Sequence, residues 1–201
     1  MANFTAIASV GKTLERLLNA RFAIDVPVVG SATQAVLVRT DDFSLTANET
    51  LILPPALSIF LVRVDVDRTM RAAWSAVGAA DGHSHLPLNL HYLLTAWASN
   101  ADHEQRILGS AMRCLEDTPI LHGPVLDVST GAGWRATEAV QVIAEEMSTE
   151  AVMRTFDSLD TDYRLSVPYV ARIARIDGLE DDSQDPVVTA ITGLTPSPVL
   201  P

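Results

Sequence analysis

The stretch LPLNLHYLLTAWA, residues Leu86–Ala98, decides whether this chain is built on a sheet or on helices alone. Its even-numbered positions are all apolar or aromatic and its odd-numbered positions are mixed, which is typical of a strand. Apolar residues also follow helical spacing, at Leu86, Leu90, Leu93, Leu94 and Trp97. Periodicity alone therefore leaves both structures open, although Tyr92, Thr95 and Trp97 favour a strand. In a strand, the even face should line the core, with His91 and Trp97 on the odd face.

The segment that follows supports the strand. A strand that ends near Ala98 can lead directly into a helix, because residues 102–116 place their apolar side chains on one helical face. Asp102 and Gln105 have the spacing of a capping box, and the pair Thr118-Pro119 should end the helix.

Three further segments have the composition of strands. Ser58–Arg68 alternates between apolar and mostly charged residues. This pattern favours a strand, because a strand gathers the charged side chains on one face and a helix would scatter them. Gln34–Thr40 is a short β-branched run. Tyr163–Asp177 alternates over its whole length but contains Pro168. Because proline has no N–H to give to a ladder, this strand should lie at an edge or be locally bulged.

Helical patterns occur in the first residues and beyond the middle of the chain. Phe4–Phe22 has one apolar and one polar side and predicts an amphipathic helix. Thr137–Met147 and Thr149–Leu159 predict two short helices, with Ser148 as the N-cap of the second.

Together these elements predict an α+β fold with a mixed, mostly antiparallel sheet of about four strands packed against helices. Residues 1–178 should form one domain, since 201 residues supply one core. Residues 179–201 are acidic and then rich in proline, so we expect a tail that is flexible or ordered by a partner. Residues 69–86 are small and polar, and they predict a mobile connection.

The charge balance narrows the classes of partner. The chain has 25 acidic and 14 basic residues, for a formal net charge of −11, which argues against binding to nucleic acid or an anionic membrane. The single cysteine, Cys114, permits no intramolecular disulfide and fits a reducing compartment. The first residues lack a basic start and a long apolar run, so we expect a cytoplasmic protein without signal peptide or membrane span.

We predict no catalytic, cofactor-binding or metal-ligating residues, and no cofactor. His83 and His85 form an HxH pair, but without a third ligand nearby they are better interpreted as solvated loop histidines. Asp65 and Asp67 share one strand face, where a solvent-facing role beside Arg63 is favoured over a site for a hard cation.

Three weaker features also have structural interpretations. The glycines of Gly131-Ala132-Gly133 lack the other residues of a phosphate-binding loop. Gly109-Ser110 lies inside a predicted helix and lacks the flanking glycine of a nucleophile elbow. Cys114 falls near the apolar face of that helix, which favours a buried side chain over a reactive thiol. Subunit assembly through sheet edges is better supported than catalysis.

Four blocks carry a family resemblance, and in order they are SIFLVRVDVDRTMR, LPLNLHYLLTAWASN, EQRILGSAMRCLEDTPIL and RLSVPYVARIARID. In this order and spacing they resemble the N-terminal domain of the cap, or tail-terminator, proteins of phage-tail-like contractile injection systems of the antifeeding-prophage and virulence-cassette type. The resemblance covers roughly residues 1–178. Some relatives continue into a further C-terminal region, where this chain has only its tail.

The resemblance implies a structural protein that forms a homo-hexameric ring on the distal end of the inner tube and sheath and stops their polymerisation. Its partners would be copies of itself, the inner tube protein and the sheath protein, without nucleic acid or membrane. It would assemble in the cytoplasm and remain in the particle. We expect contact surfaces at residues 69–85, at the tail and at Tyr163–Asp177, with salt-sensitive docking of the acidic ring on a basic layer.

Two alternatives stay open. A related phage tail-completion or sheath-joining protein would have the same fold and act at a different layer. A small hydrolase or metal-binding enzyme would use His83, His85, Asp65 or Asp67, and this alternative has the weakest support.

Overall fold

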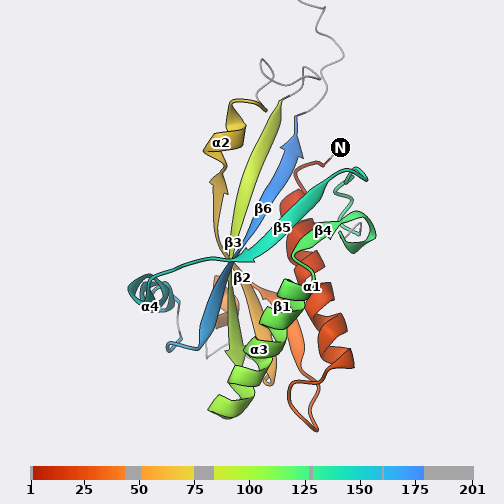
Figure 1. Ribbon diagram of the computed structural model, residues 1–201. Coiled ribbons are helices and arrows are strands. Elements are labelled where there is room, and N and C mark those ends of the chain that lie inside the picture. Colours follow the sequence, from red (N-terminus) through yellow and green to blue (C-terminus); the bar gives the residue numbers. More distant parts are fainter. Residues whose placement is uncertain (1, 44–50, 75–83, 127–128, 160, 179–201) are drawn as a thin grey trace, which may run out of the picture.

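The computed structural model describes residues 2–43, 51–74, 84–126, 129–159 and 161–178. The described residues form one six-stranded sheet in the order β1-β2-β3-β6-β5-β4, in which β1 is parallel to β2 and all other neighbours are antiparallel (Figure 1). The strands are β1 (Gln34–Val38), β2 (Ala56–Val66), β3 (His85–Trp97), β4 (Ile120–His122), β5 (Ala139–Ala144) and β6 (Ser166–Asp177). The helices are α1 (Ala6–Ile24), α2 (Arg68–Arg71), α3 (Ala101–Asp117) and α4 (Thr149–Asp157), with 3-10 turns at Thr40–Phe43 and Gly123–Val125.

The predicted α+β class with a mixed, mostly antiparallel sheet is therefore confirmed, with six strands instead of about four. Residues 179–201 and 75–83 lie outside the described residues, and so does His83. No helix among the described residues is long and apolar enough to cross a membrane.

The opening stretch is the central strand, β3, and its helical alternative is wrong. β3 pairs with β2 on one side and with β6 on the other. The even face lines the main core, as predicted, with Leu90, Tyr92 and Leu94 all 2% exposed or less. The odd face is buried too, since His91 is 8% and Trp97 7% exposed. Burial on both faces explains why apolar residues satisfied two periods at once.

One face of the sheet, which we call the first face, is covered by α1 and α3 (Figure 1). Both helices bury an apolar stripe against it, and the buried residues include Val10, Leu14, Leu18, Ile107 and Leu115. The predicted amphipathic helix at the start of the chain is thus confirmed as α1. These contacts remove most of the apolar surface of the two helices from water, which is the main favourable term in folding.

The opposite face, the second face, is covered over only part of its length. There α4 packs Phe156 over Leu93 and Trp97 in a smaller apolar cluster (Figure 1). Ser148 is the N-cap of α4, as predicted, and its hydroxyl oxygen accepts the Ala151 N–H at 3.2 Å. Toward the top of Figure 1, where β2 and β6 end, the second face is polar. We call this end of the sheet the upper end.

The predicted helix over Thr137–Met147 is wrong, because the segment contains strand β5. Val140 and Val142 are buried on the first face, while Ala139 before them and Gln141 between them are exposed. This alternation has the period of a strand, and the backbone pairs with β4 and β6.

The prediction that β6 is an edge strand is also wrong, since β6 lies between β3 and β5. Pro168 accepts the Glu145 N–H at 3.0 Å, so its own nitrogen points toward β5, whose ladder ends one residue earlier at the pair Ala144 and Tyr169. No ladder bond is lost at this position. A register shift does occur in β6, between Ala171 and Ala174, away from the proline.

The N-cap of α3 differs from the predicted capping box of Asp102 and Gln105. Asn100 is the cap, and its side-chain oxygen accepts the His103 N–H at 2.9 Å. Asp102 instead forms an ion pair with Arg106, one turn further along the helix, at 2.8 Å. The helix ends at Asp117, just before Thr118-Pro119, as predicted.

Candidate assembly surfaces

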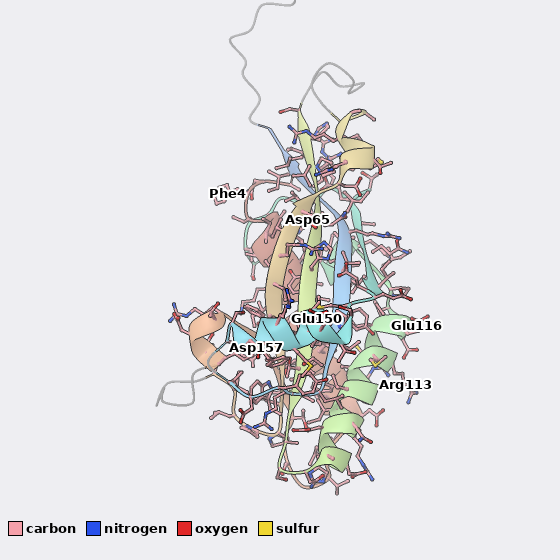
Figure 2. The ribbon with its side chains drawn as sticks, turned by 90° about the vertical axis from the view of Figure 1, so that its left-hand side faces the viewer. Phe4, Asp65, Arg113, Glu116, Glu150 and Asp157 are labelled. Atoms are coloured by element: carbon pink, nitrogen blue, oxygen red, sulfur yellow. The ribbon has the colours of Figure 1, made fainter. Side chains whose placement is uncertain are left out.

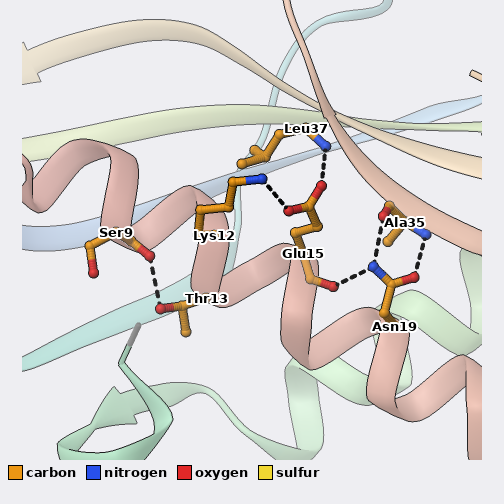
Figure 3. A network of polar contacts seen from close by, with 7 residues as sticks. All are labelled: Ser9, Lys12, Thr13, Glu15, Asn19, Ala35 and Leu37. Carbon is orange, nitrogen blue, oxygen red and sulfur yellow. Dashed lines mark hydrogen bonds and ion pairs between the residues drawn. The ribbon is translucent and has the colours of Figure 1, made fainter. Parts of the chain in front are cut away.

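The outer edge of β1 is closed by side chains of α1. The Asn19 side-chain amide donates to the Ala35 carbonyl oxygen at 2.7 Å, and its oxygen accepts the Ala35 N–H at 2.9 Å (Figure 3). Asn19 thus makes the two hydrogen bonds that a neighbouring strand would make. An asparagine on the helix occupies the place of a seventh strand.

Glu15 continues this closure one helical turn before Asn19. Its Oε1 accepts the Leu37 N–H at 3.0 Å, and its Oε2 pairs with Lys12 at 2.7 Å (Figure 3). The helix can approach the strand this closely because Gly11 has no side chain. A Cβ at Gly11 would lie 3.1 Å from Leu37 Cδ2, tighter than an ordinary contact.

The last outward N–H of this edge belongs to Arg39, and Asp42 Oδ2 accepts it at 2.8 Å. The N–H groups of Ala35, Leu37 and Arg39 are therefore all bound by side chains. An edge with its donors occupied cannot template another strand, which is one way in which proteins block edge-to-edge association.

The upper part of β2 forms a second, open edge. β1 pairs only with Ala56–Phe60, and no described strand lies beside Leu61–Val66 on that side. The Asp67 N–H donates to the Pro87 carbonyl of the β3 side at 3.0 Å. Because backbone groups alternate along a strand, Val64 and Val66 direct theirs away from β3. Their side chains are 41% and 43% exposed.

The far edge of the sheet, at β4, is short. Leu121 pairs with Val140 of β5, and Val142 donates its N–H to the Pro119 carbonyl at 2.8 Å. The neighbouring Ile120 is 49% exposed. With three residues between a proline and a turn, β4 offers little backbone to a further strand.

A network of charges occupies the polar part of the second face. His91 Nδ1 lies 2.7 Å from Glu145 Oε2, and His91 Nε2 lies 3.2 Å from Asp65 Oδ2. Asp65 also pairs with Arg63 at 2.8 Å, and Figure 2 shows it on the face that α4 leaves uncovered. The His91 ring therefore lies between two carboxyl groups, with one beside each ring nitrogen. The network connects β2, β3 and the end of β5.

His85 belongs to a second network at the upper end and is not a solvated loop histidine as predicted. It is the first residue of β3, 7% exposed, and its Nδ1 lies 2.6 Å from Asp177 Oδ1. Arg175 bridges Asp177 and Glu138 at 2.7 Å each, and its guanidinium lies 5.7 Å from the Trp74 ring centre. These contacts join the ends of β3 and β6.

Asp65 and Asp67 do not converge on one site. Asp67 is the N-cap of α2, and its Oδ1 accepts the N–H groups of Thr69 and Met70 at 3.0 Å each. The Met70 N–H, followed by the Asn89 amide, lowers the pKa of the Asp67 carboxyl. Among the described residues, no three His, Cys, Asp or Glu side chains are grouped as a metal site.

The weaker sequence features have structural roles. Asn3 donates its side-chain amide to the Gly131 carbonyl at 2.8 Å and its backbone N–H to the Ala132 carbonyl at 3.0 Å, so the glycine turn holds the start of the chain. Cys114 is 1% exposed in α3, and burial raises the pKa of its thiol. Ser110 is also in α3, and its buried hydroxyl has no hydrogen-bond partner among the described residues.

Exposed apolar side chains also gather at the lower end of the sheet, where α1 ends and β2 begins. Ile24 is 84%, Val29 88% and Leu53 69% exposed. Val29 lines a cavity of about 270 Å³ together with Pro54 and Pro55. Sequence periodicity gave no indication of this surface, because its residues come from the end of α1 and from loops.

Of the predicted contact surfaces, β6 is an internal strand, and most of the 69–85 connection and the whole tail lie outside the described residues. Sequence reasoning missed the closure of β1. Glu15 and Asn19 stand four residues apart on the polar side of α1, a spacing that puts them side by side. That spacing was the available signal, but polar residues on a helix are usually assigned to solvent.

No curated protein matches this chain. The sheath/tube terminator of the extracellular contractile injection system PVC, in its extended state, has a similar fold, with a TM-score of 0.57 and 16% identity over 100% of this chain and 67% of the other. The tube-terminating cap of the anti-feeding prophage aligns with a TM-score of 0.47 and 17% identity over 70% of this chain and 49% of the other.

The sequence comparison is independent of the fold and agrees with it. Residues 9–190 match the family described as the Pvc16 N-terminal domain, which is most of the chain and includes all four blocks that carried the resemblance. The predicted resemblance is thereby confirmed, and this protein belongs to the Pvc16 N-terminal domain family.

Proposed function

We propose that this protein is a structural cap, or tail terminator, of a contractile injection system. The observation that carries the proposal is the family match over residues 9–190. The fold agrees, since the whole chain superposes on a sheath/tube terminator. By this proposal the protein binds the distal end of the inner tube and sheath and stops their growth.

The physical requirements of a cap fit the two edges of this sheet. A terminator must join the last layer of a polymer and must not offer the same surface to a further layer. The donors of the β1 edge are bound by Asn19, Glu15 and Asp42, so this edge blocks strand addition. The apolar surfaces around Val64 and Val29 remain exposed for other contacts.

The partners in this proposal are further copies of the chain in a homo-hexameric ring, the inner tube protein and the sheath protein. The protein assembles in the cytoplasm and then remains in the particle. Because each copy carries a formal net charge of −11, the ring docks best on a basic layer, and its binding to tube ends weakens as salt screens the charges. Docking that does not change between low and high salt would contradict this electrostatic part.

An enzymatic role has less support, because the three candidate residues that the structure describes are occupied in structural contacts. Asp65 and His85 are held in ion pairs, and Asp67 caps α2. A double substitution Asp65→Asn and His83→Ala separates the two roles. A cap retains normal particle assembly with this variant, whereas an enzyme loses its activity.

The direct test is deletion of the gene from its native cluster, followed by electron microscopy of the particles. Tubes and sheaths of uncontrolled length, or particles without a closed end, are expected. Expression of the wild-type chain in trans should restore normal length and closed ends. Particles of normal length with normal ends would contradict the cap function. A defect at the baseplate end alone would instead favour a tail-completion role at another layer.

A further inference from the structure

The open edge of β2 combines exposed backbone with exposed apolar side chains. Val64 and Val66 direct their backbone groups away from β3, and their side chains are 41% and 43% exposed on the first face. Leu61–Val66 is the longest run of described strand that has no strand partner on one side. A surface of this kind is the binding site for an added strand in β-augmentation.

The tail contains one segment with the composition of such a strand. Residues 187–192 read VVTAIT, and five of these six residues are β-branched. Pro186 and Gly193 bound the run, as turn residues bound a strand. Its length of six residues equals that of the open edge Leu61–Val66. The family match extends to residue 190 and so includes the start of this segment.

Charge complementarity points to the same place. The link before the segment, residues 180–185, contains four acidic and no basic residues. The open edge ends at α2, where Arg68 and Arg71 are exposed and form no ion pair with another described residue. An acidic link that leads into the edge would pass these two guanidinium groups.

We propose that residues 187–192 of one copy bind the Leu61–Val66 edge of a second copy as an added strand. The open edge is the outer side of β2, and within one subunit β3 lies between it and β6, from which the tail continues (Figure 1). The tail of a neighbouring copy does not have to cross β3 to reach this edge. Donor and acceptor are different surfaces, and such head-to-tail contacts form a ring when the rotation between copies closes.

The strand contact is how copies would join in the proposed cap. Its role in closing a ring rests on the proposed function, but the contact itself does not. The contact itself is tested in the purified full-length protein. Subunits with Val64→Cys are mixed with subunits with Ile191→Cys and treated with a short bismaleimide. The native Cys114 is 1% exposed and should not react. A cross-linked dimer is expected, because only different chains can supply the two thiols.

The matched control replaces Val64→Cys by Val29→Cys, which is 88% exposed at the opposite end of the sheet, and should give no dimer with Ile191→Cys. Two double variants of the full-length chain test the apolar and the charged parts of the contact separately. The first is Val188→Asp with Ile191→Asp, and the second is Arg68→Glu with Arg71→Glu. Light scattering should show self-association weakened by about tenfold or more for the first pair and by less for the second.

Cross-linking that occurs only when Val64→Cys and Ile191→Cys lie on the same chain would overturn the proposal, because the tail would then bind its own subunit. Equal yields from the Val29→Cys mixture would also overturn it. Particles are examined with the Val188→Asp/Ile191→Asp variant. If particles of this variant still have normal length, the cap function stands, but the strand contact is not the element that closes the ring.

Discussion

The two parts of the sheet edge formed by β1 and β2 lie on the same side of the molecule and are treated in opposite ways. Along β1, side chains from α1 and from the following turn bind the outward N–H groups of Ala35, Leu37 and Arg39. Along the upper part of β2, Val64 and Val66 have no described strand on their outer side and expose apolar side chains. The cause is the length of β1, which pairs with only the first residues of β2.

This difference shows how one sheet can be closed to association at one place and open at another. The outward N–H groups of an edge strand bind a helix, a loop, another chain or water, so closing the β1 edge with side chains leaves the β2 edge as the one that a partner strand can reach. Substitutions at either edge can test this difference, because each changes one edge and leaves the other intact.

The largest effect is expected for Asn19→Ala, which removes both hydrogen bonds to Ala35. A partly buried donor and acceptor would lose their partners, at a cost of about 2 kcal/mol in the free energy of unfolding. Denaturant titration measures this loss. Asn19→Asp keeps the acceptor for the Ala35 N–H but sets a carboxylate oxygen against the Ala35 carbonyl oxygen, so it should not retain wild-type stability. An Asn19→Asp variant as stable as the wild type would contradict the strand-mimic interpretation.

Glu15→Ala should cost about 1 kcal/mol, because the Leu37 N–H loses its acceptor. Glu15 also pairs with Lys12, whose side chain is half exposed. The matched control is Lys12→Ala, which removes only the ion pair and should change stability by less than about 0.5 kcal/mol. The two variants would destabilise equally if the ion pair, and not the edge contact, were the source of the effect.

Asp67 ends the open edge by turning the chain into α2, and Asp67→Ala should cost about 0.5 kcal/mol at neutral pH for loss of an exposed cap. The folded state lowers the pKa of Asp67, so its stabilisation is complete above the unfolded pKa of about 4 and declines as the pH falls below it. Stability curves of wild type and variant should converge below that pH. A stability difference between wild type and variant that widens toward low pH would contradict the lowered pKa of Asp67.

The smallest effect on folding is expected for Val64→Lys with Val66→Lys. Both side chains are partly exposed, so the free energy of unfolding should change by less than about 0.5 kcal/mol per site. Lysines on an open edge oppose strand addition, so self-association should fall although the fold is kept. Circular dichroism and light scattering on the same samples measure both quantities. Unchanged association would show that the β2 edge is not used.

Several elements could be predicted from local sequence. The alternation of Ser58–Arg68 and the apolar stripe of Phe4–Phe22 identified β2 and α1. Ser148 identified the start of α4, because a cap is a local hydrogen bond between near neighbours. The four blocks of the family resemblance lie mainly in these well-defined elements, and the family was predicted correctly.

The misassigned segments depended on their neighbours in space. Ala139–Ala144 is a strand because β4 and β6 lie beside it, although its residues also permit a helix. Pro168 suggested an edge, but the strand is internal because β5 ends where the proline lacks its N–H. His85 was assigned to a loop and is instead buried against Asp177, 92 positions away in the chain.

The sequence by itself determined the class of fold, the amphipathic helices and the family of this protein, because these depend on residue spacing within one segment. Only the tertiary structure decided which edge of the sheet is closed. That outcome rests on Asn19 and Glu15 reaching Ala35 and Leu37, and on β1 ending beside Phe60. Hydrogen bonds between segments depend on how a helix packs on a strand, and residue spacing within either segment does not contain that information.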